Sequence, residues 1–394
     1  LALCDARFLD ELEECQVAGL RTVPFDGPGA DDLARLAERQ GASFTNVDTA
    51  SDDVAMLAFT SGTTGRPKAT MHFQRDLLAI CDTFSRHLLR PRPTDVFIGT
   101  PPMAFTYGLG GALVFPLHAG AATVLLETSA PDHLLEMSRR HGVTTIFSAP
   151  TFYRNLVPLL ERSPLPSLRD GVSAGETMPA ATWEAFAATT GVRLIDGLGS
   201  TEMLHIFIGA TPEEMRPGAT GTAVPGYVAE IQDGQGNVLP VGEPGLLAVK
   251  GPTGCRYLAG DRQGRYVQRG WNLTGDVYTQ DAHGYFRYVS RADDMIISSG
   301  YNIAGPEVEA ALLRHRDVDE VAVVGIPDEA RGQLVKAFVV LRQGIGGDDR
   351  LLGELQDFCK GEIAPYKYPR AIEFVETLPR TATGKLQRFR LRQP

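Results

Sequence analysis

Short apolar runs alternate with helical patterns from the first residue to about residue 225. The run "VAMLAF" (54–59) is long enough for a buried strand and too short for a helix. Farther along the chain, apolar residues recur at helical spacing, at Leu77, Leu78, Cys81, Phe84 and Leu88. We therefore expect the segment between them, "TSGTTGRPK" (60–68), to join a buried strand to the approach of a helix.

The same pattern of a strand followed by a helix recurs later in this part of the chain. The stretches that show it are "TTIFSAP" with "TFYRNLVPLL", "GVSAGE" with "ATWEAFAATTG", and the final strand "VRLIDGLGS". Such alternation predicts an α/β sheet with ligand-binding loops at the ends of its strands.

The pattern changes twice more, and we expect three parts: 1–225, 226–291 and 292–394. Residues 226–291 contain short strands and glycine-rich turns such as "AEIQDGQGNVL", which indicate a β-rich subdomain of the large domain. From residue 292 onward, a helix beginning near Pro306 and several apolar runs predict a small α+β domain. The expected fold class is α/β, with a large N-terminal domain and a small, mobile C-terminal domain hinged near Asp293.

The most apolar stretch is "GLGGALVFPLHAGAATVLLE" (108–127). Pro116, His118 and several glycines interrupt it, so a buried strand-turn-strand is expected in place of a membrane span. The composition, 43% hydrophobic and 22% charged over 394 residues, is that of a globular protein. A net charge of -10 leaves no basic face for nucleic acid, so neither nucleic acid nor a membrane is expected as a partner.

The five cysteines are an odd number, widely spaced and without a CxxC pair. They indicate a reducing compartment and no zinc site. The opening "LALCDARFLDEL" is acidic where a signal peptide would be basic, so we expect a cytoplasmic protein. The chain also begins without methionine, inside what resembles an αβ unit, as a fragment would. The sequence leaves a homodimer open.

The segment "TSGTTGRPK" carries the chemistry of a phosphate-binding loop. It is not a Walker A loop, because Pro67 and Ala69 stand where that motif needs a glycine and a Ser or Thr. Its glycines still allow backbone N–H groups to turn inward, its hydroxyls donate hydrogen bonds, and Lys68 adds a positive charge. The alternative is a surface turn rich in glycine and threonine.

Five further motifs follow this loop in order along the chain. They are "SAGE" (173–176), "DGLGSTE" (196–202), "TGD" (274–276), "SRADDMI" (290–296) and "PRTATGK" (379–385). Together with the loop, they resemble the adenylate-forming superfamily of acyl-CoA synthetases, peptide-synthetase adenylation domains and luciferases. The resemblance runs over almost the whole chain and implies ATP, Mg²⁺ and coenzyme A as cofactors.

The resemblance also implies the roles of individual residues toward ATP. Glu202 is the magnesium ligand, Thr201 contacts phosphate, and Asp276 binds the ribose with help from Arg291. A polar-turn glutamate and a capping aspartate are the alternative interpretations of Glu202 and Asp276. The full set of implied cofactor-binding residues is Thr60, Ser61, Gly62, Thr63, Thr64, Lys68, Ser173, Ala174, Gly175, Glu176, Asp196, Gly197, Asp276, Arg291, Gly300 and Tyr301.

Composition alone would make Lys385 a solvated lysine, but the resemblance implies that it is the catalytic lysine. A cation there would bridge an anionic carboxylate and an anionic α-phosphate as charge redistributes between them. The resemblance implies a two-step reaction, in which an acyl-adenylate forms first and its acyl group then passes to coenzyme A. The small domain would turn about Asp293 between the steps, removing Lys385 and presenting the "SSGYN" face.

The stretches "MAFTYGLGG" (103–111) and "GSTEMLHIF" (199–207) resemble the benzoate and 2-aminobenzoate CoA ligases. Aromatic side chains next to glycines would fit a small aromatic acid, although such residues are more often plain core. His205 would hydrogen-bond the carboxylate or a ring substituent, and we count it with the catalytic residues; the alternative is a satisfied buried histidine. The expected pocket residues are Phe105, Thr106, Tyr107, Leu198, Gly199 and His205, with Phe207 supplying further apolar surface.

Three positions depart from the family pattern: Ala69, Ser290 and Ile297. Ile297 replaces a lysine that is common two residues after the "DDM" segment, so the role of that cation must be dispensable or filled elsewhere. The expected function is an ATP-dependent aryl-CoA ligase for a benzoate, 2-aminobenzoate or hydroxybenzoate type of acid. The alternatives are activation of another acyl acid, loading of a carrier-protein thiol, or an inactive nucleotide-binding fragment.

Overall fold

The computed structural model of the chain describes all residues except 62–66, 255, 260–261, 300, 381–385 and 393–394. The chain divides into two compact units, Leu1–Ala50 and Ser51–Pro394. In the first unit, two parallel strands pair and two short helices accompany them. These elements are β1 (Ala2–Asp5), α1 (Leu9–Glu14), β2 (Thr22–Phe25) and α2 (Leu33–Glu38).

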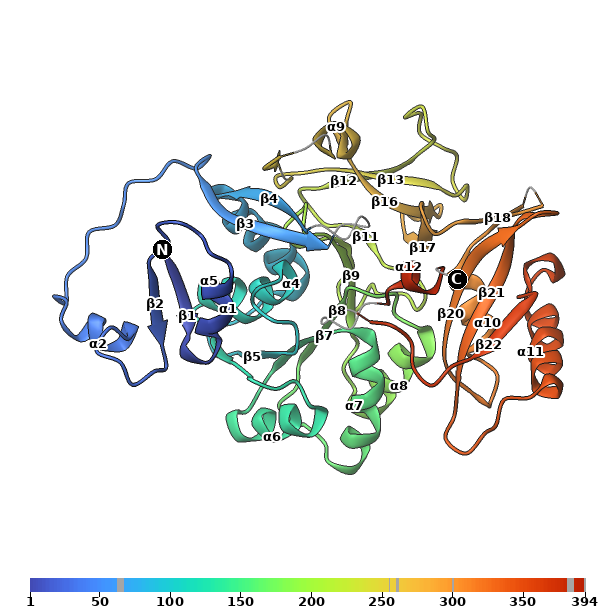
Figure 1. Cartoon of the computed structure of the whole chain (residues 1–394), viewed down its shortest axis with the longest axis horizontal. Helices are drawn as coiled ribbons and strands as arrows, with labels where there is room; N and C mark the ends of the chain where they lie inside the picture. The colour runs from blue at the N-terminus through green and yellow to red at the C-terminus, as the bar shows by residue number, and fades with distance from the viewer. Residues whose placement is uncertain (62–66, 255, 260–261, 300, 381–385, 393–394) are drawn as a thin grey trace. The chain divides into compact units, whose positions relative to one another are not determined.

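The second unit contains a seven-stranded sheet in the order β11-β10-β9-β8-β7-β5-β6 (Figure 1). Its strands are β5 (Val96–Gly99), β6 (Ala122–Val124), β7 (Thr145–Ser148), β8 (Asp170–Ala174), β9 (Ile195–Gly199), β10 (Ile206–Gly209) and β11 (Thr222–Ala223). The five strands from β6 to β9 are parallel, and β10 and β11 run antiparallel to their neighbours. Strands β7 and β8 are buried along their whole length, as expected in a parallel sheet covered by crossover helices.

Helices connect the parallel strands as the alternating pattern predicts. They are α6 (Pro131–His141), α7 (Pro150–Arg162) and α8 (Ala180–Thr190), which precede β7, β8 and β9 respectively. Proline stands at the start of α6 and α7, where its missing N–H costs no hydrogen bond. Glycine follows α6 and α8 in the left-handed conformation that ends a helix.

A second sheet has the order β12-β13-β16-β15, with β17 also pairing β16. Its strands are β12 (Val228–Gln232), β13 (Gly245–Lys250), β15 (Val267–Gln268), β16 (Trp271–Gln280) and β17 (Phe286–Arg291). A three-stranded sheet joins β14 (Arg256–Tyr257), β4 (Pro67–Phe73) and β3 (Val54–Ser61). The sheet made of β12, β13, β15, β16 and β17 lies within 226–291, where the sequence predicts a β-rich subdomain.

The C-terminal part contains a five-stranded sheet and its own buried core. Its elements are β18 (Ile296–Ser298), β19 (Tyr301–Ile303), α10 (Gly305–Leu312), β20 (Val318–Asp328), β21 (Gly332–Leu341), α11 (Asp349–Glu362), β22 (Ala371–Phe374) and α12 (Arg388–Leu391). Proline lies in the first turn of α10, as predicted. The α/β fold class with a large N-terminal and a small C-terminal part is confirmed.

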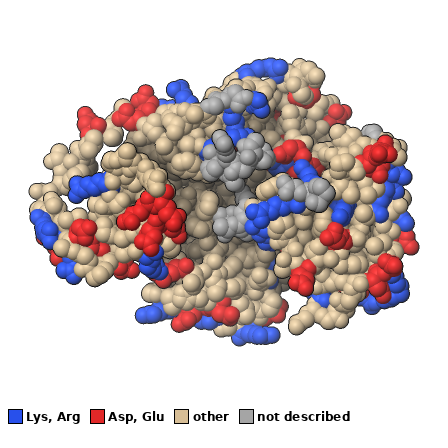
Figure 2. Space-filling view, in the orientation of Figure 1, with Lys and Arg blue, Asp and Glu red and all other residues tan. Residues whose placement is uncertain are grey.

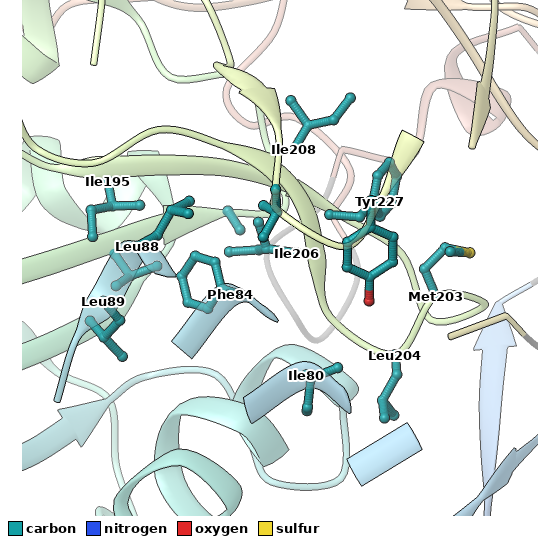
Figure 3. Packing of buried hydrophobic residues seen from close by; sticks show 14 of the residues in the cluster. Ile80, Phe84, Leu88, Leu89, Ile195, Met203, Leu204, Ile206, Ile208 and Tyr227 are labelled. Atoms are coloured by element: carbon teal, nitrogen blue, oxygen red, sulfur yellow. The ribbon is translucent and has the colours of Figure 1, made fainter. Parts of the chain in front are cut away.

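The largest core forms where one long helix packs on the central sheet (Figure 3). Helix α3 (Gln74–Ile80) continues in wider, π-type turns as Cys81–Leu89. Ile80, Phe84 and Leu88 recur one turn apart and pack in one cluster with the β9 and β10 side chains Ile195 and Ile206. The helical spacing of these apolar residues is confirmed.

Two local predictions are wrong. Strand β3 is not buried, because Val54, Leu57 and Phe59 are 48%, 43% and 61% exposed and only Ala58 is buried. The segment that follows it joins β3 to the antiparallel strand β4, and helix α3 begins only after β4. An apolar run of this length cannot by itself distinguish a buried strand from the exposed face of a small sheet.

Residues 108–127 do not form a strand-turn-strand. The segment is mainly helical, as α4 (Thr106–Leu109), π-type turns over Gly110–Val114 and α5 (Phe115–Ala119), followed by the short strand β6. Leu113 and Leu117 face solvent, so the apolar stretch belongs to a surface helix. Throughout the part of the chain that the structure describes, every helix is too short or too polar to cross a membrane.

We expect Phe186→Ala to lower the free energy of unfolding by about 3 to 5 kcal/mol, because it removes a fully buried ring and leaves a cavity. The Phe186 ring packs edge-on against Tyr153 at 5.1 Å between centroids. Urea unfolding followed by the fluorescence of Trp183 and Trp271 measures the change. The same substitution at Phe44, which is 83% exposed, should change stability by less than about 0.5 kcal/mol. Equal effects of the two substitutions would contradict this packing.

Candidate active site

Two of the predicted motifs, "SAGE" and "DGLGSTE", lie at the carboxyl ends of the parallel strands β8 and β9, next to that of β7. In the parallel register, Ser148 pairs with Ser173, and Ser173 pairs with Asp196. Directly paired residues share a face of the sheet, so three polar side chains line up across adjacent strands. Open α/β sheets bind ligands at this edge.

Two of these side chains carry buried polar atoms that the protein itself leaves unused. Asp196 is 8% exposed and Ser173 is fully buried. Among the described residues, neither Asp196 Oδ1 nor Ser173 Oγ has a hydrogen bond of regular geometry, although the Ser173 hydroxyl and the Gly197 N–H lie near enough to the carboxyl group to offset part of the rise in its pKa. Burial raises the pKa of Asp196 from 3.8 to about 7. Since unpaired buried polar atoms are costly, this pair is suited to a ligand that supplies hydrogen bonds, as an adenine base would.

The rest of the "SAGE" segment forms the turn after β8. Ala174 ends the strand and is buried, whereas Gly175 is exposed with a φ of +93°, a conformation that favours glycine. Glu176 accepts a hydrogen bond from Thr151 Oγ1 at 2.7 Å. Gly197 follows Asp196 in β9, where it is packed by Ile206 and has no room for a side chain.

Two residues of the predicted phosphate loop lie opposite each other at its base. Thr60 on β3 pairs with Lys68 on β4, one step before the pair of Ser61 with Pro67. Thr60 Oγ1 is buried and has no hydrogen-bond partner among the described residues. Gly62, Thr63 and Thr64 lie outside the described residues. The antiparallel pairing brings the hydroxyl of Thr60 and the backbone of Lys68 to the same end of the β3–β4 hairpin.

Glu202, the predicted magnesium ligand, is buried and held by two residues that the sequence did not single out. Tyr257 Oη donates to Glu202 Oε1 at 2.5 Å, and Arg262 Nε donates to Tyr257 Oη at 2.9 Å. Arg262 Nη2 also lies 3.9 Å from Glu202 Oε1. Tyr257 and Arg262 therefore orient the carboxylate. Their only sequence signal is their position after "GPTG", which carries no chemistry by itself.

The residues around Glu202 fit Mg²⁺ bound together with a nucleotide. Among the described residues, no group of three or more His, Cys, Asp or Glu side chains could hold a metal ion by itself. Magnesium commonly takes one or two carboxylates and completes its shell with water and substrate phosphates. A single carboxylate, oriented by Tyr257 from the strand that pairs with β4, meets that requirement.

The loop that carries Thr201 and Glu202 is anchored at two backbone carbonyls. His72 Nε2 lies 2.8 Å from the carbonyl oxygen of Thr201, and Thr253 Oγ1 donates to that of Met203 at 2.8 Å. A carbonyl oxygen only accepts, so His72 must carry its proton on Nε2 for this bond. The buried Leu204 has a φ of +69°, which is strained for a branched side chain. The anchors hold the loop in this conformation.

The predicted ribose-binding pair is brought together by strand pairing. Asp276 on β16 lies opposite Arg291 on β17, and Arg291 Nη1 donates to Asp276 Oδ1 at 2.9 Å. The same nitrogen donates to the Thr274 carbonyl at 3.2 Å, and Arg291 Nε lies 3.6 Å from Asp293 Oδ1. Asp293, the predicted hinge, therefore lies directly beside this pair.

His205 is enclosed by aromatic rings. Its ring lies 4.6 Å from Phe115, 5.1 Å from Phe84 and 5.8 Å from Tyr107, measured between centroids. His205 is 2% exposed, and neither ring nitrogen has a hydrogen-bond partner among the described residues. Burial lowers the pKa of His205 to about 3, so the imidazole is neutral. The backbone of Tyr107 lies close enough to one ring nitrogen to influence the pKa of His205, so the other nitrogen stays available to a polar ligand.

The other predicted pocket residues divide between buried and exposed positions. Tyr107 Oη donates to the Val172 carbonyl at 2.8 Å, which ties α4 to β8, and burial raises the pKa of Tyr107 well above its ordinary value. Thr106 is buried, Phe105 is 43% exposed, and Leu198 and Gly199 are half-buried at the end of β9. Phe207 is fully buried and stacks toward Tyr227 in the core.

The glycines near this cluster make room for the protein's own atoms. A Cβ at Gly110 would lie 2.5 Å from the ring of His205, and one at Gly108 would lie 2.1 Å from the Pro102 carbonyl oxygen. These glycines let α4 and the turns after it pack tightly on the histidine.

Three remaining predicted residues lie apart from this set or outside the described residues. Tyr301 on β19 is 54% exposed and stacks on Tyr366 at 4.5 Å. Lys385 and Gly300 lie outside the described residues. A hollow of about 60 Å³ adjoins Glu176, much smaller than most small-molecule sites. Its lining residues are Pro150, Thr151, Arg154, Glu176, Thr177, Pro179 and Thr182.

The charge distribution agrees with the composition. On the face shown in Figure 2, lysine and arginine side chains lie among acidic and uncharged ones and form no extended basic area.

Comparison with known proteins identifies relatives along nearly the whole chain. The protein family described as AMP-binding enzyme matches residues 3–257, and the family described as AMP-binding enzyme C-terminal domain matches residues 307–385. A benzoate–CoA ligase of Thauera aromatica is 38% identical over 97% of this chain and 72% of its own length. The mitochondrial acyl-coenzyme A synthetase ACSM4 of Homo sapiens is 38% identical over 88% of this chain and 62% of its own.

Solved structures agree with these sequence matches. The crystal structure of the anthranilate CoA ligase AuaEII in complex with anthranoyl-AMP superposes with a TM-score of 0.91 at 34% identity. The match covers 99% of this chain and 77% of that one.

The raised pKa of Asp196 predicts a pH-dependent stability. The folded protein keeps the Asp196 proton up to about pH 7, whereas the unfolded chain loses it near 3.8, so the folded state binds more protons between these values. The free energy of unfolding should therefore fall as the pH rises from 4 to 7. Asp196→Asn removes this dependence. Its stability relative to wild type should rise over that range, by on the order of a few kcal/mol, and level off above it.

Urea unfolding of both proteins at several pH values measures this difference. Phe44→Ala, at an exposed residue without an ionisable side chain, provides the control, and its difference from wild type should stay constant from pH 4 to 8. A constant difference for Asp196→Asn as well would show that burial does not hold the proton on Asp196.

Proposed function

This chain belongs to the AMP-binding enzyme family, and we propose that it is an ATP-dependent aryl-CoA ligase. It would activate a small aromatic carboxylic acid, of the benzoate, 2-aminobenzoate or hydroxybenzoate type, as an acyl-adenylate and then transfer the acyl group to coenzyme A. The names of two relatives support this substrate class, since one is a benzoate–CoA ligase and another an anthranilate CoA ligase bound to anthranoyl-AMP.

The observation that carries the proposal is the composition of one short loop. This loop after β9 carries Glu202, whose carboxylate is oriented by Tyr257. Three residues later it carries His205, which is enclosed by aromatic rings. The same strand carries Asp196, whose unpaired carboxylate oxygen suits a base. An acid seated next to the aromatic cluster would therefore hold its carboxylate beside the nucleotide phosphates.

The first step is attack by the carboxylate oxygen of the acid on the α-phosphorus of ATP. A bond forms between that oxygen and phosphorus as the bond from phosphorus to the bridging oxygen of pyrophosphate breaks, so the products are acyl-AMP and pyrophosphate. Thr60, Ser61, Lys68 and the loop between them would bind the phosphates, and Lys385 would lie between the two anions. Magnesium held by Glu202 would neutralise phosphate charge when bound.

The second step is attack by the thiol sulfur of coenzyme A on the carbonyl carbon of the acyl-adenylate. A carbon–sulfur bond forms, the bond from the carbonyl carbon to the AMP oxygen breaks, and the thiol proton passes to solvent. Neutral His205 can donate one hydrogen bond and accept another, so it can orient the acid's carboxyl group or a ring substituent. We propose Asp293 as the hinge about which residues 292–394 turn between the steps, presenting Gly300 and Tyr301.

The ion pair of Arg291 with Asp276 and its contact with Asp293 support this assignment. In the pair, Asp276 offers a carboxylate that can accept hydrogen bonds from two ribose hydroxyls, and Arg291 holds that carboxylate in place. Because Arg291 also contacts Asp293, a turn at residue 293 would move Arg291 and so shift the carboxylate of Asp276 that is proposed to bind the ribose.

A second candidate function is activation of a non-aromatic acid. The human relative ACSM4, an acyl-coenzyme A synthetase, is as similar in sequence identity as the benzoate–CoA ligase. We favour the aromatic acid because the side chains around His205 are planar rings.

The cysteines among the described residues are all free, which supports a reducing, cytoplasmic environment.

The proposed function predicts that the chain releases pyrophosphate and forms a CoA thioester with benzoates. The protein is incubated with Mg²⁺-ATP, coenzyme A and each member of a panel of benzoates and fatty acids, and both products are measured. Thioester formation with fatty acids alone would support the second candidate. Pyrophosphate release without thioester would favour a carrier-protein thiol as acceptor, and no product with any acid would favour an inactive nucleotide-binding protein.

We expect Lys385→Ala to lower acyl-adenylate formation by at least about 100-fold, because it removes the cation between two approaching anions. Thioester formation from synthetic acyl-AMP and coenzyme A should remain within a few fold of wild type, since no second anion approaches the phosphate in that step. Single-turnover measurement of each half-reaction separates the two effects. Equal loss in both half-reactions would refute this role for Lys385.

A further inference from the structure

Arg380 joins two carboxylates that come from distant parts of the chain. Its Nη2 donates to Glu320 Oε2 at 2.7 Å, and its Nη1 donates to Glu176 Oε1 at 3.4 Å. Glu320 lies on β20 of the C-terminal part, whereas Glu176 lies in the turn after β8. A planar guanidinium with five N–H groups is suited to bridging two carboxylates in this way.

The large-domain end of this bridge is itself held in place. Thr151 Oγ1, at the start of α7, donates to the second oxygen of Glu176 at 2.7 Å. At the other end, Arg154 Nη2 lies 3.9 Å from Glu320 Oε1. Glu176 thus has both oxygens engaged, one by the large domain and one by Arg380. Its direction is set before Arg380 binds.

Arg380 also stands at the base of the segment that contains Lys385. Arg380 and Leu386 pair as an isolated antiparallel bridge, and Gln387 N donates to the Pro379 carbonyl at 2.8 Å. The two ends of the segment 381–385 therefore meet, and Lys385 directly precedes Leu386 in the sequence. Contacts that fix the side chain of Arg380 therefore also fix the paired residues Arg380 and Leu386, which flank 381–385.

We propose that Arg380 is a positioning residue for acyl-adenylate formation, and this inference rests on the proposed function. Its ion pairs with Glu176 and Glu320 hold the base of the Lys385 segment at the turn after β8. The pair with Glu176 must break when residues 292–394 turn for the thioester step, whereas the pair with Glu320 lies within those residues and can persist.

The strength of these ion pairs suits a contact that opens in each cycle. The side chains of Arg380, Glu176 and Glu320 are 31%, 21% and 27% exposed, so solvent screens their attraction. A partly exposed pair of this kind shifts an equilibrium by a few fold, and only the pair with Glu176 differs between the two orientations. A fully buried pair would be much more costly to separate and would slow the second step.

The test compares both half-reactions in wild type, Arg380→Ala and Arg380→Lys. We expect Arg380→Ala to lower the rate of pyrophosphate release from ATP and a benzoate by a few fold, while thioester formation from synthetic acyl-AMP is unchanged or faster. Arg380→Lys should recover part of the loss, because a lysine can pair one carboxylate but cannot bridge two. Glu320→Gln should also slow only the first half-reaction, and its effect should be less than additive with Arg380→Ala.

Arg314→Ala is the matched control, since Arg314 forms a 2.8 Å ion pair with Glu362 elsewhere in the C-terminal part. Neither half-reaction should change in that variant. Equal slowing of both half-reactions by Arg380→Ala, or no slowing of either, would overturn the inference.

Hydrogen–deuterium exchange of residues 379–387 provides a readout that needs no catalysis. Amide protection of this segment should fall in Arg380→Ala and Glu320→Gln and stay at the wild-type level in Arg314→Ala. If the wild type releases no pyrophosphate with any acid, the proposed function fails, and the exchange result then decides the positioning role by itself. Unchanged protection in Arg380→Ala would reject it.

Discussion

The parallel pairing of β7, β8 and β9 is the constraint on which the candidate site depends. It places Ser148, Ser173 and Asp196 side by side across three strands, although they are far apart in the sequence. A slip of one residue in this register would turn Asp196 toward the opposite face of the sheet. The helices that cover the sheet also bury Asp196, which raises its pKa and leaves a carboxylate oxygen for a ligand. The pairing that builds the sheet therefore also places the polar side chains of the candidate site.

The loop after β9 shows how the surrounding elements hold a strained segment in place. His72 from β4 and Thr253 bind its backbone carbonyls, and Tyr257 from β14 binds Glu202. Strands β4 and β14 pair with each other in the small three-stranded sheet. The same sheet therefore presents the predicted phosphate loop and orients the predicted magnesium ligand. A single small sheet can in this way keep two groups that act on the same phosphates at a constant separation.

Glu176 links the turn after β8, where we propose that the nucleotide binds, to the C-terminal part. One of its oxygens is held by Thr151 and the other by Arg380, so the turn proposed to bind the nucleotide also contacts the C-terminal part. A two-step reaction that exchanges catalytic surfaces needs contacts that are specific in direction but modest in strength. Partly exposed ion pairs meet both requirements, because a guanidinium fixes geometry while solvent limits the free energy of the contact.

The sequence by itself determined the order of strands and helices in 128–225 and 292–394, the order of the motifs and, by resemblance, the family. These features depend on local periodicity and on short motifs, which a single chain displays directly. Tertiary structure decided the exposure of β3, the helical form of 108–127 and the partners of Glu202 and His205. In this segment Gly108 and Gly110 pack closely against Pro102 and His205, contacts that no local pattern contains. Tyr257, Arg262 and Arg380 reach the site through long-range pairing of strands and charges, and such pairing depends on the folded chain as a whole.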